Sequence, residues 1–82
     1  MMMKQKRIML PTVADAKEFV AAASKCDFDI DVFYNRVIID AKSILGVLSL
    51  DLTRVLTVSY SGENAEFEEF LEERAADKTH AA

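Results

Sequence analysis

The strict alternation of apolar and acidic residues in FDIDVFY (28–34) constrains the fold of this chain more than any other feature. One side of the segment carries Phe28, Ile30, Val32 and Tyr34. Asp29 and Asp31 point the other way, because successive side chains of a strand lie on opposite faces. Such a strand is half-buried, as in antiparallel sheets with one packed and one solvated face. The segment therefore predicts a sheet that is covered on one side only.

Three further segments are predicted to be strands of the same sheet. They are KRIML (6–10), VIIDA (37–41) and RVLTVSY (54–60). Pro11 ends the first of them, since proline lacks the N–H that a continuing strand would need. Asn35-Arg36 is predicted to be the tight turn before the third strand, although an arginine suits a positive φ less well than a glycine would.

Three segments with apolar residues at helical spacing lie between and after these strands. They are TVADAKEFVAAASK (12–25), SILGVLSL (43–50) and ENAEFEEFLEERAA (63–76). Thr12 is a good N-cap for a helix over about 13–25, and Asp15 three residues later resembles a capping box. The order β-α-β-β-α-β-α predicts an α+β fold, an open-faced sandwich with a four-stranded antiparallel sheet and three helices on one face.

The 82 residues, 51% of them apolar, are enough for one domain. A chain of this size buries roughly 60% of its unfolded surface. We expect a single domain over 1–82, with a core over about 5–74 and a frayed tail over 75–82. No apolar run reaches 18 residues, and Ile8 to Leu10 is too short for a signal peptide, so we expect a cytoplasmic protein that inserts into no membrane.

The net charge of −4 argues against nucleic-acid binding, because phosphate contacts need clustered cations. The only basic cluster is Lys4, Lys6 and Arg7, which we interpret as a solvated strand edge. The acidic pairs 68–69 and 72–73 are expected to be solvated on the last helix.

Few residues of this chain suit catalysis or metal binding. Cys26 is the single cysteine, so it forms no intrachain disulfide and no metal-binding pair, and we interpret it as a small buried hydrophobe. His80 is the single histidine and lies in the tail, where a catalyst is not expected. The two glycines are isolated and form no phosphate-binding loop. We therefore expect neither an enzyme nor a cofactor or metal.

The segment DAKSILGVLSL (40–50) leaves two interpretations open. In the first, residues 47 and 50 face the sheet while Ile44, Leu45 and Leu48 are partly exposed, and an exposed apolar patch often marks a partner site. In the second, all five apolar residues belong to the core. Ser43 begins the helix in either case, because serine is favoured as an N-cap.

Three stretches resemble HPr, the small phosphocarrier of the bacterial sugar phosphotransferase system. They are FVAAASKCDFDIDVFYN (19–35), AKSILGVLSL (41–50) and SGENAEFEEFLEE (61–73). The likeness covers roughly residues 5–74 and implies the open-faced β-sandwich of that family. Between SLDL and VLTV, however, this chain has only two residues, where HPr proteins usually have a longer loop with a glycine.

The chain departs from the family where the family carries its phosphoryl group. HPr opens its first helix with Gly-φ-His-x-Arg-Pro-Ala, whereas this chain has LPTVADA (10–16). Thr12 falls at the histidine position, Ala14 at the arginine position and Asp15 at the proline position. A threonine is no substitute for a nucleophilic imidazole, and alanine removes a phosphate clamp. We therefore expect that this chain does not accept phosphate from enzyme I, and the alternative is a carrier that uses another residue such as Thr12.

The resemblance also implies a regulatory role for Ser43, which falls on the serine that an ATP-dependent HPr kinase phosphorylates in many Gram-positive bacteria. The other interpretation of Ser43 is a plain N-cap. The implied partner-binding residues are Ile44, Leu45, Leu48, Lys42, Lys17 and Ser24. The implied partners are an HPr kinase, a catabolite-control-type regulator or phosphotransferase components. A degenerate paralogue with only a scaffold role is a further alternative, and the oligomeric state stays open.

Overall fold

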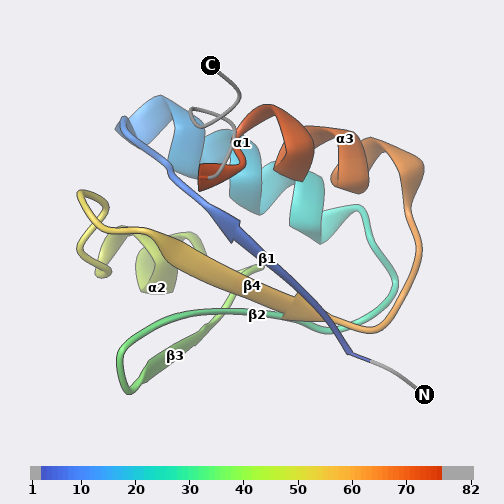
Figure 1. Cartoon of the computed structure of the whole chain (residues 1–82), viewed down its shortest axis with the longest axis horizontal. Helices are drawn as coiled ribbons and strands as arrows, with labels where there is room; N and C mark the ends of the chain where they lie inside the picture. The colour runs from blue at the N-terminus through green and yellow to red at the C-terminus, as the bar shows by residue number, and fades with distance from the viewer. Residues whose placement is uncertain (1–2, 77–82) are drawn as a thin grey trace.

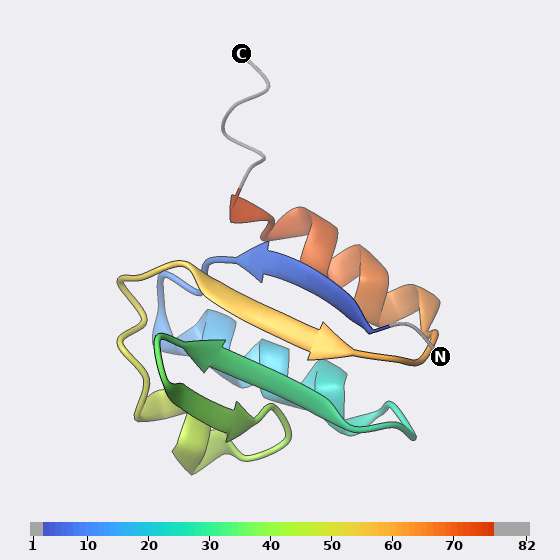
Figure 2. The same cartoon turned by 60° about the horizontal axis from the view of Figure 1, so that its bottom comes forward.

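The computed structural model describes residues 3–76 and contains one four-stranded antiparallel sheet with three helices on one of its faces (Figure 1). The elements are β1 (Lys4–Ile8), α1 (Val13–Ser24), β2 (Ile30–Tyr34), β3 (Val37–Asp40), α2 (Ile44–Leu48), β4 (Leu56–Tyr60) and α3 (Ala65–Glu73). Figure 2 shows the opposite face of the sheet, which no helix covers. The predicted α+β architecture and element order are confirmed. The expectations for His80 and for most of the tail concern residues outside the described part of the chain.

The strands lie in the order β1-β4-β2-β3, so β4, the last strand in sequence, is central in the sheet. Val58 of β4 pairs with Lys6 of β1 on one side and with Val32 of β2 on the other. Val32 in turn pairs with Ile39 of β3. This row faces the helices, and the alternate row faces solvent, as the period-two pattern of the sequence predicts.

The core lies between the sheet and the helices. The largest fully buried side chains are Tyr60, Phe19, Phe67, Ile8, Leu10, Ile30, Leu56, Leu71, Val32, Val47 and Val58. The rings of Tyr60 and Phe67 meet edge to face with centroids 5.3 Å apart, and Phe19 lies 6.2 Å from Phe67. Aromatic contacts of this kind join β4, α1 and α3 into one cluster.

Each helix begins at a polar side chain that accepts a hydrogen bond from the first turn. Thr12 accepts from the Asp15 N–H, Ser43 from the Gly46 N–H and Asn64 from the Phe67 N–H. These bonds satisfy N–H groups that have no partner within the helix. The predicted N-caps Thr12 and Ser43 are confirmed.

The predicted turn at Asn35-Arg36 is present and joins β2 to β3, with Tyr34 paired to Val37. Asn35 has φ 55°, and it is the one non-glycine residue in 3–76 with a positive φ. Asparagine tolerates this left-handed region better than most residues. The positive φ of the turn therefore falls on Asn35 and not on Arg36.

Two expectations about the surface are wrong in part: that the basic strand edge is solvated, and that the acidic pairs 68–69 and 72–73 are solvated. The basic edge strand β1 is only partly solvated, because the side chains of Lys4 and Lys6 are 39% and 40% exposed and their ammonium groups lie 3.2 Å and 3.9 Å from Glu68 and Glu72 of α3. Glu68 is half-buried and also accepts a 2.7 Å hydrogen bond from the Tyr60 hydroxyl. The basic strand therefore neutralises part of the acidic helix.

Cys26 is buried, in agreement with its interpretation as a small hydrophobe. Its thiol lies 3.6 Å from the Ala22 carbonyl oxygen, to which it donates. Burial raises the pKa of this thiol, so Cys26 stays protonated near neutral pH.

Candidate functional site

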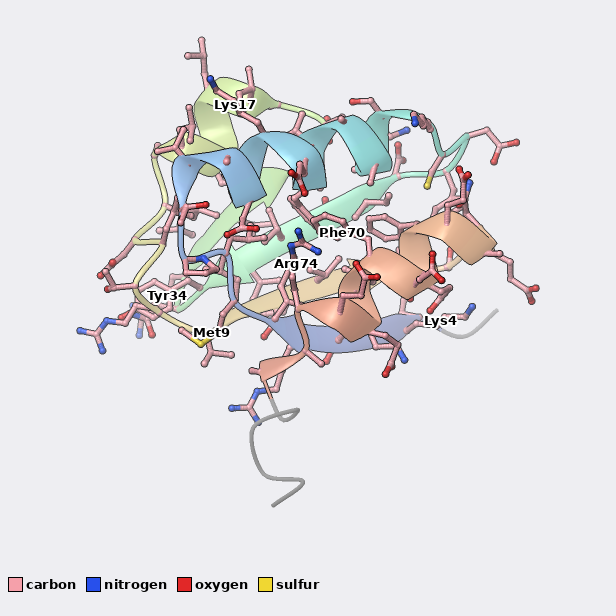
Figure 3. All side chains as sticks on the ribbon, turned by 90° about the horizontal axis from the view of Figure 1, so that it is seen from above. Lys4, Met9, Lys17, Tyr34, Phe70 and Arg74 are labelled. Atoms are coloured by element: carbon pink, nitrogen blue, oxygen red, sulfur yellow. The ribbon has the colours of Figure 1, made fainter. Side chains whose placement is uncertain are left out.

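The N-terminus of α1, where the sequence places the family's phosphoryl-carrying position, lies beside the C-terminus of α3. The Met9 N–H donates a 3.0 Å hydrogen bond to the Arg74 carbonyl oxygen, and Ile8 forms an isolated antiparallel bridge with Ala75. These backbone contacts hold the end of α3 against the segment that leads into α1. Figure 3 shows the Arg74 side chain extending from that end toward α1.

Arg74 forms an ion pair with Asp15 in the first turn of α1. The Nε and Nη2 atoms of Arg74 each lie 3.2 Å from Asp15 Oδ1, and Nη2 also lies 2.9 Å from Glu18 Oε1. The guanidinium group packs on the Phe70 ring, with its carbon 4.1 Å from the ring centroid. The side chains of Arg74 and Asp15 are only 20% and 22% exposed. The arrangement is therefore a partly buried pair with fixed geometry.

Asp15 is a carboxylate at neutral pH. The Thr12 hydroxyl donates a 2.8 Å hydrogen bond to Asp15 Oδ2, and this bond, together with Arg74, lowers the pKa of Asp15. A negative charge in the first turn also interacts favourably with the positive end of the helix dipole. The N-terminus of α1 thus contains an internal anion that has its own counter-ion.

Thr12 and Ala14 are both exposed at this end of α1. The Thr12 oxygen serves as helix cap and as donor to Asp15, and Ala14 offers only a methyl group. The nearby cation, Arg74, is engaged by Asp15, Glu18 and Glu73. Within residues 3–76 no side chain supplies an imidazole here, since the single histidine of the sequence, His80, lies outside the described residues.

The second candidate region is the surface of α2. Leu45 is 81% exposed and Leu48 36% exposed, while Val47 and Leu50 are buried. Ile44 is half-buried. The expected division of this segment into an inward and an outward side is therefore confirmed, and the interpretation in which all five residues belong to the core is wrong.

Gly46 explains why α2 can lie so close to the sheet. A Cβ atom at this position would come within 2.5 Å of the Ile39 Cγ2 atom of β3. The absence of a side chain allows the close approach, which places Val47 in the core and turns Leu45 toward solvent. The glycine inside the apolar run thus sets the orientation of the exposed surface.

Ser43 lies at the exposed start of α2. Its backbone N–H donates to the Asp40 carbonyl oxygen at 3.0 Å, and its side-chain oxygen accepts from the Gly46 N–H at 3.1 Å. Neighbouring Lys42 is half-buried, and its ammonium group donates a 2.9 Å hydrogen bond to the Cys26 carbonyl oxygen. Lys42 therefore ties the start of α2 to the end of α1, a structural contact that the sequence did not indicate.

The two residues expected on the first helix, Lys17 and Ser24, are both exposed. Figure 3 shows Lys17 on the side of α1 where α2 lies, and the two helices pack against each other. Ser24 is the last residue of α1, far along the helix from Thr12. Lys17 can thus share a surface with α2, whereas Ser24 marks the other end of α1.

Arg74 is the site residue that sequence reasoning missed. It lies 59 positions from Asp15, so no spacing rule connects them. The one available signal was Asp15 itself, an acidic residue at the position where the resembled family has proline.

Residues 3–76 contain no group of three His, Cys, Asp or Glu side chains that could hold a metal ion. Within the same residues no helix is long and apolar enough to cross a membrane.

Comparison with known proteins identifies the family of this chain. Residues 13–76 match the family described as PTS-HPr, PTS HPr component phosphorylation site. HPr-C-His from Thermoanaerobacter tengcongensis has 27% sequence identity and a TM-score of 0.70, over 100% of this chain and 99% of that chain. A phosphocarrier protein HPr from Bacillus anthracis str. Ames has 30% identity and a TM-score of 0.64, over 90% of this chain and 94% of that chain. The fold, the matched residues and these relatives together show that the chain belongs to the HPr family of the phosphotransferase system.

Proposed function

We propose that this HPr-family protein carries no phosphoryl group at the start of α1 and acts instead as a regulatory, protein-binding module through α2 and the adjoining part of α1. The observation that carries the first half of the proposal is the ion pair between Asp15 and Arg74. It places an internal anion in the first turn of α1. The second half rests on the exposure of Leu45 and Leu48 beside Ser43.

Phosphoryl transfer through a histidine requires an imidazole that is nucleophilic near neutral pH. Thr12 supplies a hydroxyl, which is far less nucleophilic and already caps the helix. The phosphoryl ester of a threonine also lacks the protonated nitrogen leaving group that makes phosphohistidine a donor. A phosphorylated Thr12 would therefore be a stable product and a poor carrier.

Electrostatics oppose an incoming phosphoryl group at the same place. Helix N-termini bind phosphate because their N–H groups and dipole attract anions. Here the Asp15 carboxylate contacts the Thr12 hydroxyl at 2.8 Å, so a phosphate on Thr12 would lie beside a negative charge. Two like unit charges about 4 Å apart repel by about 1 kcal/mol in water and about 4 kcal/mol near a protein surface.

The alternative of a carrier that uses Thr12 has one observation in its favour. The same hydrogen bond from Thr12 to Asp15 is the geometry in which a carboxylate could act as general base. Enzyme I with labelled phosphoenolpyruvate separates the two functions. Our proposal predicts no label on the protein, and stoichiometric transferable label would contradict it.

The regulatory half of the proposal concerns Ser43. A phosphoryl group transferred from ATP to Ser43 Oγ, with release of ADP, would add a charge of about −1.5 to −2 next to exposed Leu45. A phosphate oxygen could still accept the Gly46 N–H that the serine now caps. Phosphorylation would thus change the surface that a partner contacts without removing the cap.

The partners we propose are proteins: an HPr kinase that modifies Ser43 and a catabolite-control-type regulator or a phosphotransferase component that docks on α2. Purified HPr kinase with ATP tests the first, with intact-mass measurement as readout and Ser43→Ala as control. A single phosphoryl group on the wild type and none on the variant supports the proposal. If the protein stays unmodified, and its Leu45 and Leu48 variants bind these partners as well as the wild type does, the protein is instead a scaffold paralogue.

A further inference from the structure

The two edges of the sheet differ in their protection against strand pairing. Strand β1 carries the cations Lys4, Lys6 and Arg7, and charged residues on an edge strand discourage a further strand from pairing. Strand β3, with the sequence VIID, contains no lysine, arginine or proline. Its residue Ile38 is 67% exposed. Figure 2 shows β3 at the margin of the sheet opposite β1.

The free edge of β3 presents backbone groups that suit an added strand. Ala41 donates a 2.9 Å hydrogen bond to the Ile30 carbonyl oxygen, which fixes residues 37, 39 and 41 as those whose backbone faces β2. Bonds alternate in an antiparallel ladder, so the N–H and C=O groups of Ile38 and the N–H of Asp40 face outward. The Asp40 carbonyl oxygen already accepts a hydrogen bond from the Ser43 N–H of the same chain.

The sequence of this edge, RVIID (36–40), is complementary to itself when two copies run antiparallel. We propose that β3 pairs with β3 of a second copy of this chain about a two-fold axis through Ile38. In this register Ile38 lies opposite Ile38 of the other copy, and Arg36 opposite Asp40. Two oppositely charged pairs then flank an apolar centre, an arrangement that favours cross-strand pairing.

The charges already on the open face support this partner. Asp31 and Asp40 lie directly opposite each other on β2 and β3, and like charges in this relation are unfavourable. Neither aspartate, nor Arg36, forms an ion pair with another side chain in residues 3–76. Arg36 of a second copy would place a cation beside this unbalanced pair.

The apolar residues of the open face lie in the same row. Phe33 pairs with Ile38 across β2 and β3, and the row continues to Thr57 of β4 and Arg7 of β1. Pairing about Ile38 would join the Phe33 and Ile38 side chains of both copies into one apolar stripe. One short strand is much smaller than a standard interface of about 1,600 Å², so we infer a weak dimer that forms at high protein concentration.

The experiment is a charge exchange followed by sedimentation equilibrium at protein concentrations up to about 1 mM, a range suited to an interface below standard size. The wild type should show a monomer–dimer equilibrium. Arg36→Asp and Asp40→Arg each place like charges opposite each other, and each should weaken self-association about tenfold or more. An equimolar mixture of the two variants restores both oppositely charged pairs and should associate at least as well as the wild type. The far-ultraviolet circular dichroism of each variant checks that it folds.

Gln5→Lys on the other edge strand is the matched control and should leave the dimer unchanged. The proposal is overturned if the wild type stays monomeric or if the single variants associate like the wild type. It is also overturned if the mixture does not associate or if the control loses association. Should Asp40→Arg fail to fold, hydrogen exchange of the Ile38 amide in the wild type tests the proposed strand pairing instead. Pairing predicts protection of this amide that increases with concentration, and exchange independent of concentration contradicts it.

Discussion

The guanidinium group of Arg74 lies 3.2 Å from the carboxylate of Asp15, although the two residues are 59 positions apart in the chain. This contact joins the end of α3 to the start of α1. It also sets the charge at the start of α1, where the sequence resemblance places the family's phosphoryl-carrying position. The Asp15 carboxylate, with its own counter-ion, places a negative charge in the first turn of α1, where the N–H groups of a helix would otherwise attract a phosphate.

Arg74→Ala should destabilise the protein by about 1–2 kcal/mol, because the variant leaves Asp15 without its charged hydrogen-bond partner and removes the guanidinium from the Phe70 ring. Urea unfolding measures the loss. Arg54→Ala is the matched control, since Arg54 pairs with Asp51 at 3.4 Å in an exposed position. The control should unfold almost like the wild type. Equal losses in both variants would show that the Asp15 pair has no special role.

The contribution of Asp15 to stability should depend on pH. The pKa of Asp15 is below its ordinary value of 3.8 in the folded protein, so the unfolded state binds a proton first as the pH falls. The stabilisation is therefore complete well above pH 3.8 and is lost as the pH falls through the lower folded pKa. Unfolding of the wild type and of Asp15→Asn, compared between pH 7 and pH 2.5, should show a difference that is constant near neutral pH and shrinks in acid. A difference that grows in acid contradicts the assignment.

Variants of Ser43 separate its capping role from its proposed modification. Ser43→Ala removes the acceptor of the Gly46 N–H and should cost about 1 kcal/mol, the usual loss for an N-cap. Ser43→Asp keeps a good capping oxygen and should be nearly as stable as the wild type. Thermal unfolding of the three proteins tests this order. Equal stability of the alanine and aspartate variants would mean that the hydrogen bond to Gly46 contributes little.

The two sides of α2 should respond in opposite ways to substitution. Leu45→Lys changes a side chain that is 81% exposed and should alter the free energy of unfolding by no more than about 0.5 kcal/mol. Val47→Ala removes two buried methyl groups and should cost about 2 kcal/mol. Denaturant titration of both variants checks the difference. A large loss in the Leu45 variant would show that Leu45 stabilises the fold and is not free for a partner.

Local patterns were sufficient to predict most of the fold. The alternation in 28–34 identified Ile30 and Val32 as buried, because side chains repeat every second residue on a face. Thr12 and Ser43 identified two helix starts, because capping depends only on the next three residues. These features involve neighbours in sequence, and the structure confirms them.

The contacts that the sequence did not reveal join elements that lie far apart along the chain. Arg74 reaches Asp15, Lys42 reaches the Cys26 carbonyl, and Lys4 reaches Glu68. Each depends on where packing places two elements. Val13 illustrates a related limit, since it is one of the apolar residues of the predicted helix over 13–25 and yet it is exposed. Periodicity assigns a residue to a face but does not say whether the sheet extends beneath it.

The central claim is that the start of α1 cannot carry a transferable phosphoryl group. The most direct measurement incubates the wild type and the triple variant Thr12→His, Ala14→Arg, Asp15→Pro with enzyme I and labelled phosphoenolpyruvate, and counts acid-labile label on each protein. The account predicts no label on the wild type and label on the triple variant, which regains the family's residues and shows that enzyme I recognises this fold. Stoichiometric acid-labile label on the wild type would contradict the account.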